Sequence, residues 1–251
     1  MDIGRTTNGE GFDTATYPNY KDLRERVTTL SELYALRVEP LPISLSDGQD
    51  AERIYGVPVS GNYFRALGVV PAHGRFLADA DDRQNGPPVV VISYELWQRR
   101  FAGAPDIVGR RVSFNTQPVT IIGVTPRGFQ GTTVMRADTW LPLNLSHVAA
   151  PRFGRDMFTN RRASWIVMGG RLRPGGTIAQ ADAELRSLGH ALEREYPDEN
   201  RGRGYRVATS AVIPGQIEAV AGFIGVLLAI VALVLLAACV NLAGMLLARA
   251  T

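Results

Sequence analysis

An apolar run near the C-terminal end constrains the fold of this chain most. Positions 219–248 carry no charged side chain, and Glu218 and Arg249 flank them. An α-helix rises about 1.5 Å per residue and the hydrocarbon core of a bilayer is roughly 30 Å thick, so about 20 apolar residues are enough to cross it. A buried helix of a globular protein is usually shorter and carries a polar stripe, whereas only Cys239 and Asn241 interrupt this run. The sequence therefore predicts one transmembrane helix at 219–248.

Small residues recur inside this run at a spacing that suits helix packing. Ala221 and Gly225 are four positions apart, as are Gly244 and Ala248, and Asn241 carries the one amide side chain of the run. Small residues let a second helix approach closely, and an amide can form a hydrogen bond across such an interface. Because small residues are also common in membrane helices generally, the spacing leaves both interpretations open, and an interface is favoured most at Asn241. These five positions form the candidate helix-packing site.

The residues before the run are numerous enough to bury a hydrophobic core. Lys21 is the only lysine, and no glycine-rich loop lies near it. A P-loop needs a lysine that reaches the phosphates, so this chain does not bind ATP in that way. Cys239 is the only cysteine, which excludes an internal disulfide and a cysteine metal cluster.

The sequence lacks the residue patterns that are typical of catalytic and metal sites. The three histidines show no H-x-x-x-H or H-E-x-x-H spacing, and no G-x-S-x-G motif is present. Asp79, Asp81 and Asp82 raise a calcium hypothesis, but their loop lacks the central glycine and later glutamate of an EF-hand, so a solvated turn is favoured. We therefore expect a noncatalytic protein with no catalytic residue, no cofactor and no metal site.

Hydrophobic periodicity predicts an α+β fold for the soluble part. Residues 1–16 are rich in small polar residues and are predicted to form a flexible arm. Amphipathic spacing predicts helices after Pro18 and Ser93, and Thr177 with Gln180 forms a capping box for a helix from Ile178. Short apolar runs predict a helix at 61–67 and strands at 33–38, 43–45, 53–59, 89–92, 110–114, 118–124, 140–143, 165–172 and 205–208. Two β-α halves with a hairpin-rich stretch between them predict a core domain at 17–213 that carries a small β subdomain at about 108–145.

Several segments, in order, resemble the periplasmic core domain of MacB-type ABC transporter permeases. They are RIYGVPVSGNYFRALGVVPAHGRF, PVVVISYELWQRRFAGAPDIVGRRVSFNTQPVTIIGVTPRGFQG and RLRPGGTIAQADAELRSLGHALEREYP. The closing LLAACVNLAGMLLARA resembles the membrane helix that follows this domain in the MacB/FtsX superfamily. The resemblance covers roughly residues 17–250, and the spacing is most similar to the acidobacterial-type duplicated permeases, which lack a fused ATPase.

The resemblance implies a fold and a function. The fold is a MacB-like periplasmic core domain, with porter-like β-α units and an inserted β part, followed by one transmembrane helix. The function is that of a noncatalytic permease component whose periplasmic domain couples ATPase-driven motion to substrate extrusion or partner docking. The implied partners are the membrane, a separate cytoplasmic ABC ATPase, a second copy or another permease subunit, and a membrane-fusion protein, with no nucleic acid. The alternative is an FtsX-like membrane-anchored protein that regulates envelope enzymes.

The resemblance also bears on completeness and orientation. Family members carry one membrane helix before this domain and three more after it, so we expect the chain to be a truncated piece of a permease. Arg201, Arg203 and Arg206 precede the apolar run and Arg249 follows it, and this count alone favours a cytoplasmic domain. Long domains weigh little in that rule, and the resemblance implies an inner-membrane protein with a periplasmic domain.

Overall fold

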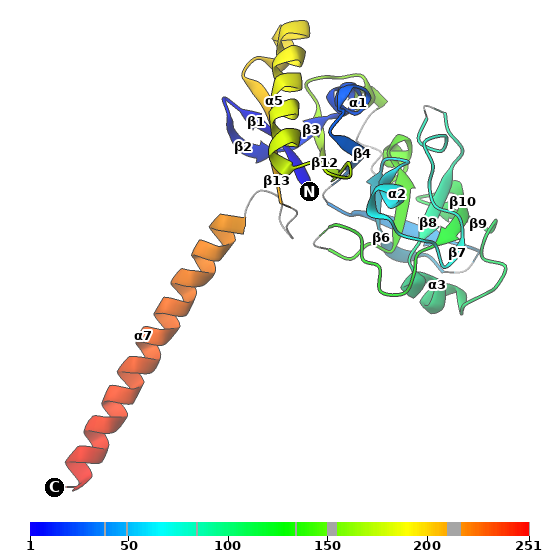
Figure 1. Ribbon diagram of the computed structural model, residues 1–251. Helices are drawn as coiled ribbons and strands as arrows, with labels where there is room; N and C mark the ends of the chain where they lie inside the picture. Colours follow the sequence, from blue (N-terminus) through cyan, green and yellow to red (C-terminus); the bar gives the residue numbers. More distant parts are fainter. Residues whose placement is uncertain are drawn as a thin grey trace.

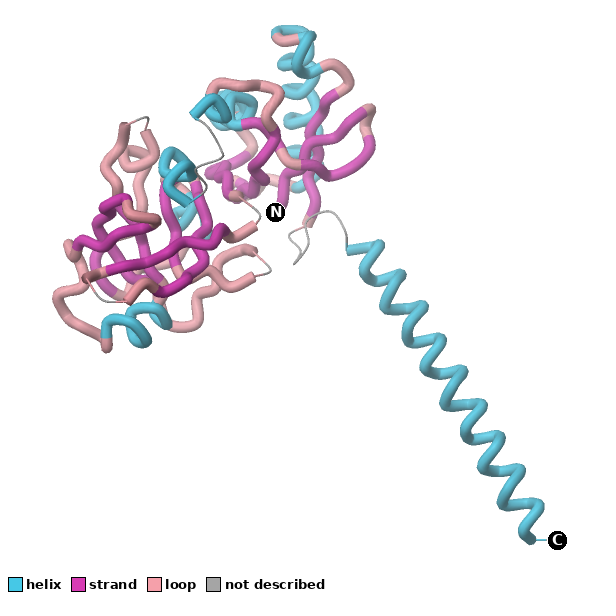
Figure 2. The backbone as a smooth tube through the Cα atoms, turned by 180° about the vertical axis from the view of Figure 1, so that it is seen from behind, coloured by secondary structure: helices cyan, strands magenta, loops and turns pink. Residues whose placement is uncertain are grey.

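Four antiparallel strands from the two ends of the soluble part form the first unit of the fold. The computed structural model describes residues 1–37, 39–48, 50–83, 85–133, 135–149, 155–209 and 217–250. In spatial order the four strands are β4 (Leu30–Leu36), β12 (Ser164–Leu172), β1 (Asp2–Thr7) and β13 (Arg203–Ala208). Helices α1 (Tyr17–Arg26) and α5 (Ile178–Glu195) cover one face of this sheet (Figures 1 and 2). The chain order β1-α1-β4-β12-α5-β13 is the β-α-β-β-α-β arrangement of ferredoxin-like folds. We call residues 1–37 and 155–209 the ferredoxin-like lobe.

The flexible arm predicted for residues 1–16 is wrong. Strand β1 lies between β12 and β13, and it pairs with β13 from Asp2↔Ala208 to Thr7↔Arg203. Strands β2 (Glu10–Asp13) and β3 (Ala15–Thr16) follow and pair with β1 and β12. Ile3 is the large apolar residue that β1 contributes to the core, at 1% exposure. Backbone hydrogen bonds to β12 and β13 hold this strand in the sheet. Its central position therefore does not require a strong hydrophobic pattern, and the sequence does not indicate it.

Helix α5 begins where its predicted capping box places it, and α1 begins at Tyr17, one residue before the Pro18 after which the sequence predicts a helix. Thr16 accepts a hydrogen bond from the backbone N–H of Asn19 at the start of α1, and Thr177 and Gln180 form the full capping box of α5. Leu185 and Leu192 of α5 are buried against the sheet. A short helix, α6 (Pro197–Asn200), separates α5 from β13.

A second unit, the barrel lobe (residues 39–149), is inserted between β4 and β12. Its strands are β5 (Leu41–Ser46), β6 (Glu52–Val59), β8 (Val89–Ile92), β9 (Arg111–Phe114), β10 (Gln117–Val124) and β11 (Thr139–Pro142). They neighbour one another in the order β11-β8-β10-β9-β5-β6, and β11 also pairs with β6, which closes the ring. The short strand β7 (His73–Gly74) adds to β10. The helical segments are α2 (Tyr63–Leu67), α3 (Tyr94–Phe101), η1 (Leu143–Leu145), α4 (Ser146–Ala149) and, in the chain that leads back to β12, η2 (Arg155–Phe158).

The expected bounds of the inserted β subdomain, about 108–145, are too narrow. Leu41, Ile43 and Ile54 share a core with Phe114 and Ile121, so β5 and β6 belong to the same barrel as the later hairpin. The register Leu45↔Phe114 joins β5 to β9 across a long stretch of sequence. Periodicity identified these strands but carries no information about which strands pair.

A third apolar cluster joins the two lobes. In β8, Val90 and Ile92 belong to the barrel core, whereas Val89 and Val91 belong to a cluster that includes Tyr34 of β4. Both faces of β8 are therefore covered, which explains its uninterrupted β-branched run. The buried aromatic side chains of the cluster also include Trp140, Tyr63 and Phe64. The two sheets meet at a single pairing between Leu36 of β4 and Val59 of β6.

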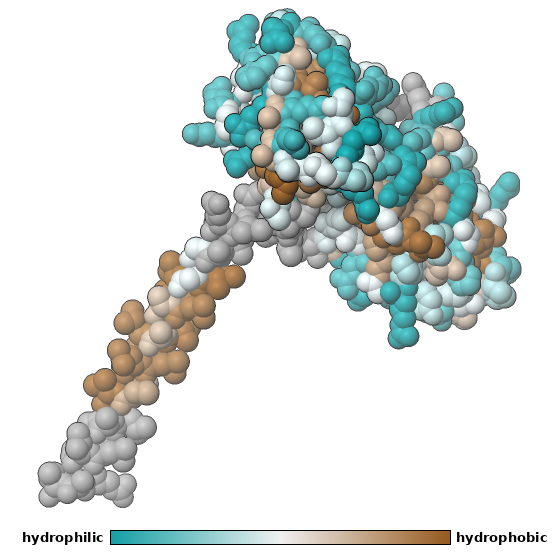
Figure 3. All heavy atoms as spheres, viewed as in Figure 1, coloured by the Kyte–Doolittle hydropathy of each residue, from teal (hydrophilic) through white to brown (hydrophobic). Residues whose placement is uncertain are grey.

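The predicted membrane helix is α7 (Ile217–Ala250). Within it, residues Gly222–Val240 are long and apolar enough to cross a bilayer, and none of that window is buried against the rest of the protein. Figure 3 shows the apolar surface that these residues expose. An exposed apolar helix of this length needs an apolar environment, and a bilayer supplies one.

Candidate functional site

The candidate helix-packing residues lie along α7. Gly225 is open on all sides, because a side chain added there would meet no atom within 4 Å. Ala221, Asn241, Gly244 and Ala248 belong to the same helix, but their side chains lie outside the described residues. The idea that these positions form a helix interface therefore stays a prediction.

The domain is attached to α7 at one end of the sheet. Strand β13 ends at Ala208, and residue 208 lies beside residue 2 in the β1–β13 register. Both ends of the folded domain therefore emerge at the same side. The backbone carbonyl of Gly170 in β12 also accepts a hydrogen bond from the terminal amine of Met1, 3.2 Å away, so three strands converge there.

Ion pairs and hydrogen bonds fasten the barrel lobe to the ferredoxin-like lobe. Glu32 of β4 binds Arg65 of α2 at 2.6 Å, and the Arg171 guanidinium of β12 donates to the Ala66 carbonyl at 2.7 Å. Asn62, just before α2, donates to both Glu32 and the Leu33 carbonyl. Together with the shared apolar cluster, these contacts hold α2 of the barrel lobe against β4 and β12 of the ferredoxin-like lobe.

A buried polar network secures α1 within the ferredoxin-like lobe. The Asn19 amide donates to the Asn200 side chain at 2.7 Å and to the Tyr205 hydroxyl at 2.9 Å. Arg161 donates to the Asn19 side-chain oxygen and to Asp22, and its guanidinium lies 3.6 Å from the centre of the Tyr196 ring. Because Asn19, Asn200 and Tyr205 are buried, losing the Asn19 amide would deprive the Asn200 side-chain oxygen and the Tyr205 hydroxyl of a hydrogen bond that water cannot easily replace.

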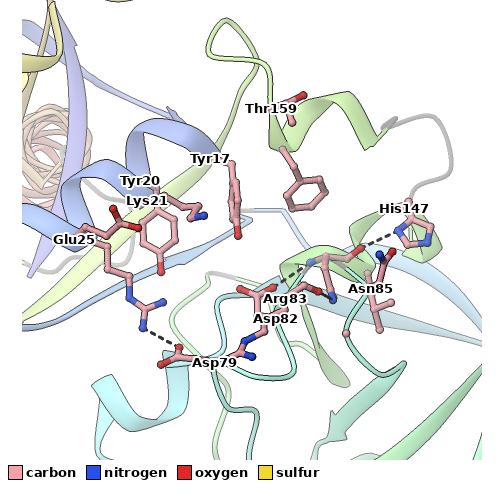
Figure 4. Close-up of a pocket in the computed structure, with 15 residues that line it drawn as sticks. Tyr17, Tyr20, Lys21, Glu25, Asp79, Asp82, Arg83, Asn85, His147 and Thr159 are labelled. Atoms are coloured by element: carbon pink, nitrogen blue, oxygen red, sulfur yellow. Dashed lines mark hydrogen bonds and ion pairs between the residues drawn. The ribbon is translucent and has the colours of Figure 1, made fainter. Parts of the chain in front are cut away.

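A cavity of about 850 Å³ lies between the lobes (Figure 4). Helix α1 and η2 form one wall, and the loop after Asp79 together with η1 and α4 forms the other. The lining side chains mix aromatic, acidic and basic groups. They are Tyr17, Tyr20, Lys21, Arg24, Glu25, Asp79, Asp82, Arg83, Asn85, Asn144, Leu145, His147, Phe158 and Thr159, with Gly86 between them.

The loop with three acids is not the solvated turn that the sequence favours. Asp81 is 4% exposed and binds Arg75 through both carboxylate oxygens, at 2.6 and 3.0 Å. Asp79 pairs with Arg24 across the cavity at 2.8 Å and with Arg65 at 3.3 Å. Asp82 accepts the backbone N–H of Asn144, and burial raises the pKa of its carboxyl to about 7. Arg24 and Arg65 are remote from Asp79 in sequence, so the pattern of the acids alone does not reveal this pairing.

The described part of the chain holds no arrangement for metal chemistry. None of its His, Cys, Asp and Glu side chains form a group of three or more that could hold a metal ion. His73 packs on Trp97, His190 lies on the exposed face of α5 near Glu193, and His147 contacts the Asn144 carbonyl. The features that remain as candidates for function are the membrane helix, the contacts between the lobes and the cavity between them.

Comparisons with known proteins agree with this architecture. The profile of the MacB-like periplasmic core domain matches residues 2–188. The periplasmic region of MacB from Actinobacillus actinomycetemcomitans has a similar structure, with a TM-score of 0.57 at 17% identity over 86% of this chain and 92% of that one. The extracellular domain of the noncanonic ABC-type transporter YknZ from Gram-positive bacteria gives 0.56 at 15% identity, over 83% and 99% of the two chains.

A third solved structure has the same fold. It is a domain of a protein assigned as a permease from Porphyromonas gingivalis, with a TM-score of 0.61 at 16% identity over 86% of this chain and 92% of that one. The comparison with curated proteins found no match.

Proposed function

Because this chain belongs to the family of MacB-like periplasmic core domains, we propose that it is the extracytoplasmic coupling module of an ABC-type permease in the inner membrane. The family supports a noncatalytic transporter component, and α7 supplies a helix long enough to anchor the domain in a bilayer. The observation that carries the proposal is that α7 follows β13 of the two-lobed domain directly in the chain order.

In this proposal, motion of α7 reaches β13 along the chain and spreads from β13 to the far lobe through a series of contacts. Displacement of α7 acts on β13, which is held to β1 along six residue pairs. Strand β1 pairs with β12, β12 pairs with β4, and β4 holds the barrel lobe through Glu32 and Tyr34. Because each step after β13 is a packed or hydrogen-bonded contact, the two lobes follow β13 when it is displaced.

We propose a separate cytoplasmic ABC ATPase as the energy source, as the resemblance to MacB-type permeases without a fused ATPase implies. A second copy of the chain or another permease subunit packs against α7 at Ala221, Gly225, Asn241, Gly244 and Ala248. A membrane-fusion protein is the partner we propose for the extracytoplasmic side.

Co-purification tests the proposal. The full chain, tagged and extracted from its native membrane in mild detergent, should recover a vanadate-sensitive ATPase activity, and a chain that ends at residue 209 should not. Recovery of a cell-wall hydrolase without ATPase activity would instead favour an FtsX-like regulator. Absence of ATPase activity from both preparations would contradict the coupling role.

A linker insertion tests transmission separately from assembly. Six glycine and serine residues inserted after Thr209 should leave ATPase recovery unchanged, because they alter neither α7 nor the folded lobes. They should abolish nucleotide-dependent movement of a fluorescent label at Val70, which is 75% exposed on the barrel lobe. Movement that persists with the inserted linker would show that α7 does not drive the domain.

A further inference from the structure

The cavity between the lobes has the composition of a binding site for an organic cation. Its inner wall carries aromatic rings from both helical segments: Tyr17 packs edge-to-face on Phe158 with ring centres 4.9 Å apart, and Tyr20 lies 6.0 Å from Tyr17. Figure 4 shows Tyr17 and Tyr20 pointing from α1 toward the loop that carries Asp82. A cleft of several hundred Å³ with apolar walls and a few converging polar groups is the usual form of a small-molecule site.

The carboxylate of Asp82 lies in this cavity without a counter-ion. It accepts the Asn144 backbone N–H at 3.1 Å and is also hydrogen-bonded to the backbone of Gly61. No ion pair joins it to any residue that the structure describes. The positive charge of Arg24 acts on Asp82 and lowers its pKa in part, but the Arg24 guanidinium is paired with Asp79 at 2.8 Å. A partly buried carboxylate that lacks a partner is electrostatically unfavourable, and a bound cation would relieve that cost.

Apart from the Arg24–Asp79 pair, three charged side chains of the cavity are exposed to solvent. Lys21 and Glu25 of α1 are exposed, as is Arg83 on the opposite wall, so water screens them from the interior. Aromatic faces attract cations through their quadrupole, and Tyr17 and Phe158 supply such rings beside Asp82. The interior therefore combines one unpaired negative charge with an aromatic wall.

We propose that this inter-lobe cavity binds an organic ammonium ion, with the charged nitrogen on Asp82 and the apolar part against Tyr17 and Phe158. The inference rests on the cavity and its side chains and not on the proposed coupling function. A ligand at this place contacts both lobes at once, so its binding also reports on their relative position.

Direct binding measurements test the proposal with defined probes. The full chain is placed in phosphatidylcholine nanodiscs, and isothermal titration compares phenethylammonium with its neutral analogue phenylethanol, with empty nanodiscs as the baseline. We expect saturable binding of the amine that is at least about fivefold tighter than that of the alcohol, because a charge-assisted hydrogen bond is lost with the alcohol. Equal binding of the two, or no saturable binding of the amine up to about 10 mM, would overturn the proposal.

Two matched variants locate the site. Asp82→Asn keeps an acceptor for the Asn144 N–H but removes the charge, and it should weaken amine binding by about tenfold or more. Glu25→Gln removes a charge at the rim of the same cavity and should change the affinity less than about twofold. Equal losses in both variants would indicate general attraction to a negative surface, and an unchanged affinity in Asp82→Asn would place the amine elsewhere.

The pH profile of the wild-type protein gives a second test that needs no variant. Since the amine pairs with ionised Asp82 and burial raises the pKa of that carboxyl to about 7, affinity should fall roughly tenfold from pH 8 to pH 6. A flat profile would contradict the assignment to Asp82. The charged or titratable groups that face Asp82 or line the same cavity are Arg24, Tyr17, Tyr20, Lys21 and Glu25 of α1, Asp79 and Arg83 of its own loop, and His147 of α4.

Discussion

Replacing Asp82 with Asn should stabilise the protein at alkaline pH and have little effect at acidic pH. Burial raises the pKa of this carboxyl to about 7, whereas an unfolded Asp titrates near 3.9. Between these values the unfolded chain has already lost the proton that the folded protein keeps, so the free energy of unfolding falls as pH rises. The stability that the raised pKa of Asp82 contributes is fully present below about pH 4 and is lost as pH rises through 7.

The size of the effect follows from the gap between the two pKa values. Each pH unit corresponds to about 1.4 kcal/mol, and about three units give an upper limit of roughly 4 kcal/mol. Asp82 keeps some contact with solvent, so we expect about 2–4 kcal/mol of added stability for Asp82→Asn at pH 8. For a protein of this size that shift corresponds to roughly 5–10 °C in melting temperature.

Tryptophan fluorescence during thermal unfolding measures this shift, because all three tryptophans lie in the domain. Comparing Asp82→Asn with the wild type at pH 4.5 and pH 8 cancels the contributions of the other carboxyl groups. A melting difference that is the same at both pH values, or a less stable variant at pH 8, would refute the reasoning.

Asp79→Asn is the matched control. Burial alone would raise the pKa of Asp79, but hydrogen bonds and charge from Arg24 and Arg65 outweigh it and hold this pKa below its usual value. The contribution of Asp79 to stability is therefore present at pH 8 and lost in acid. Asp79→Asn should accordingly be less stable than the wild type at pH 8, which is the opposite sign from Asp82→Asn.

Three more variants test the packing of the acidic loop against Gly61 within the barrel lobe, the polar network and the membrane helix. Gly61→Ala would place a methyl group 2.3 Å from the Ala78 carbonyl oxygen, so it should cost about 1–3 kcal/mol in chemical denaturation; an unchanged midpoint would mean that the loop gives way freely. Asn19→Ala removes the hydrogen bonds that the Asn19 amide donates to Asn200 and Tyr205, and it should lower the free energy of unfolding by about 1–3 kcal/mol. Wild-type stability in this variant would show that water replaces the amide. Asn241→Leu should weaken self-association in a membrane two-hybrid assay, and an equal signal would remove Asn241 from the interface.

Local signals in the sequence identified most elements of the fold. Ser93 and Thr177 accept the hydrogen bonds that their positions predict, and α3 and α5 begin directly after them. The run Val89–Ile92 is a strand that is buried on both faces. In each case the deciding interaction lies within a few residues, so a local pattern carries it.

The errors concern contacts between residues that are remote in sequence. Residues 1–16 have a weak hydrophobic pattern, yet β1 becomes a central strand because β12 and β13 pair with it from the other end of the domain. The barrel begins at Leu41 and not near residue 108, because β5 pairs with β9 across the intervening chain. Pairing of this kind depends on tertiary contacts that periodicity does not encode.

The cavity was not predictable from the sequence for the same reason. Tyr17 and Asp82 lie on different lobes, and only the packing of α1 against the loop after Asp79 brings them into one site. The one signal that could have drawn attention to it was the run of acids at 79, 81 and 82. Their roles diverge in the structure, since Asp79 and Asp81 pair with arginines and Asp82 is left facing the cavity.

The topology of the expressed chain tests the central claim most directly. In a Cys239→Ser background, Val70→Cys places a label on the exposed surface of the barrel lobe, and Thr251→Cys places one on the other side of α7. With a membrane-impermeant maleimide, the extracytoplasmic coupling role predicts labelling of position 70 in spheroplasts and of position 251 only after lysis. Labelling of position 251 in spheroplasts, with position 70 protected until lysis, would place the domain in the cytoplasm and contradict the account.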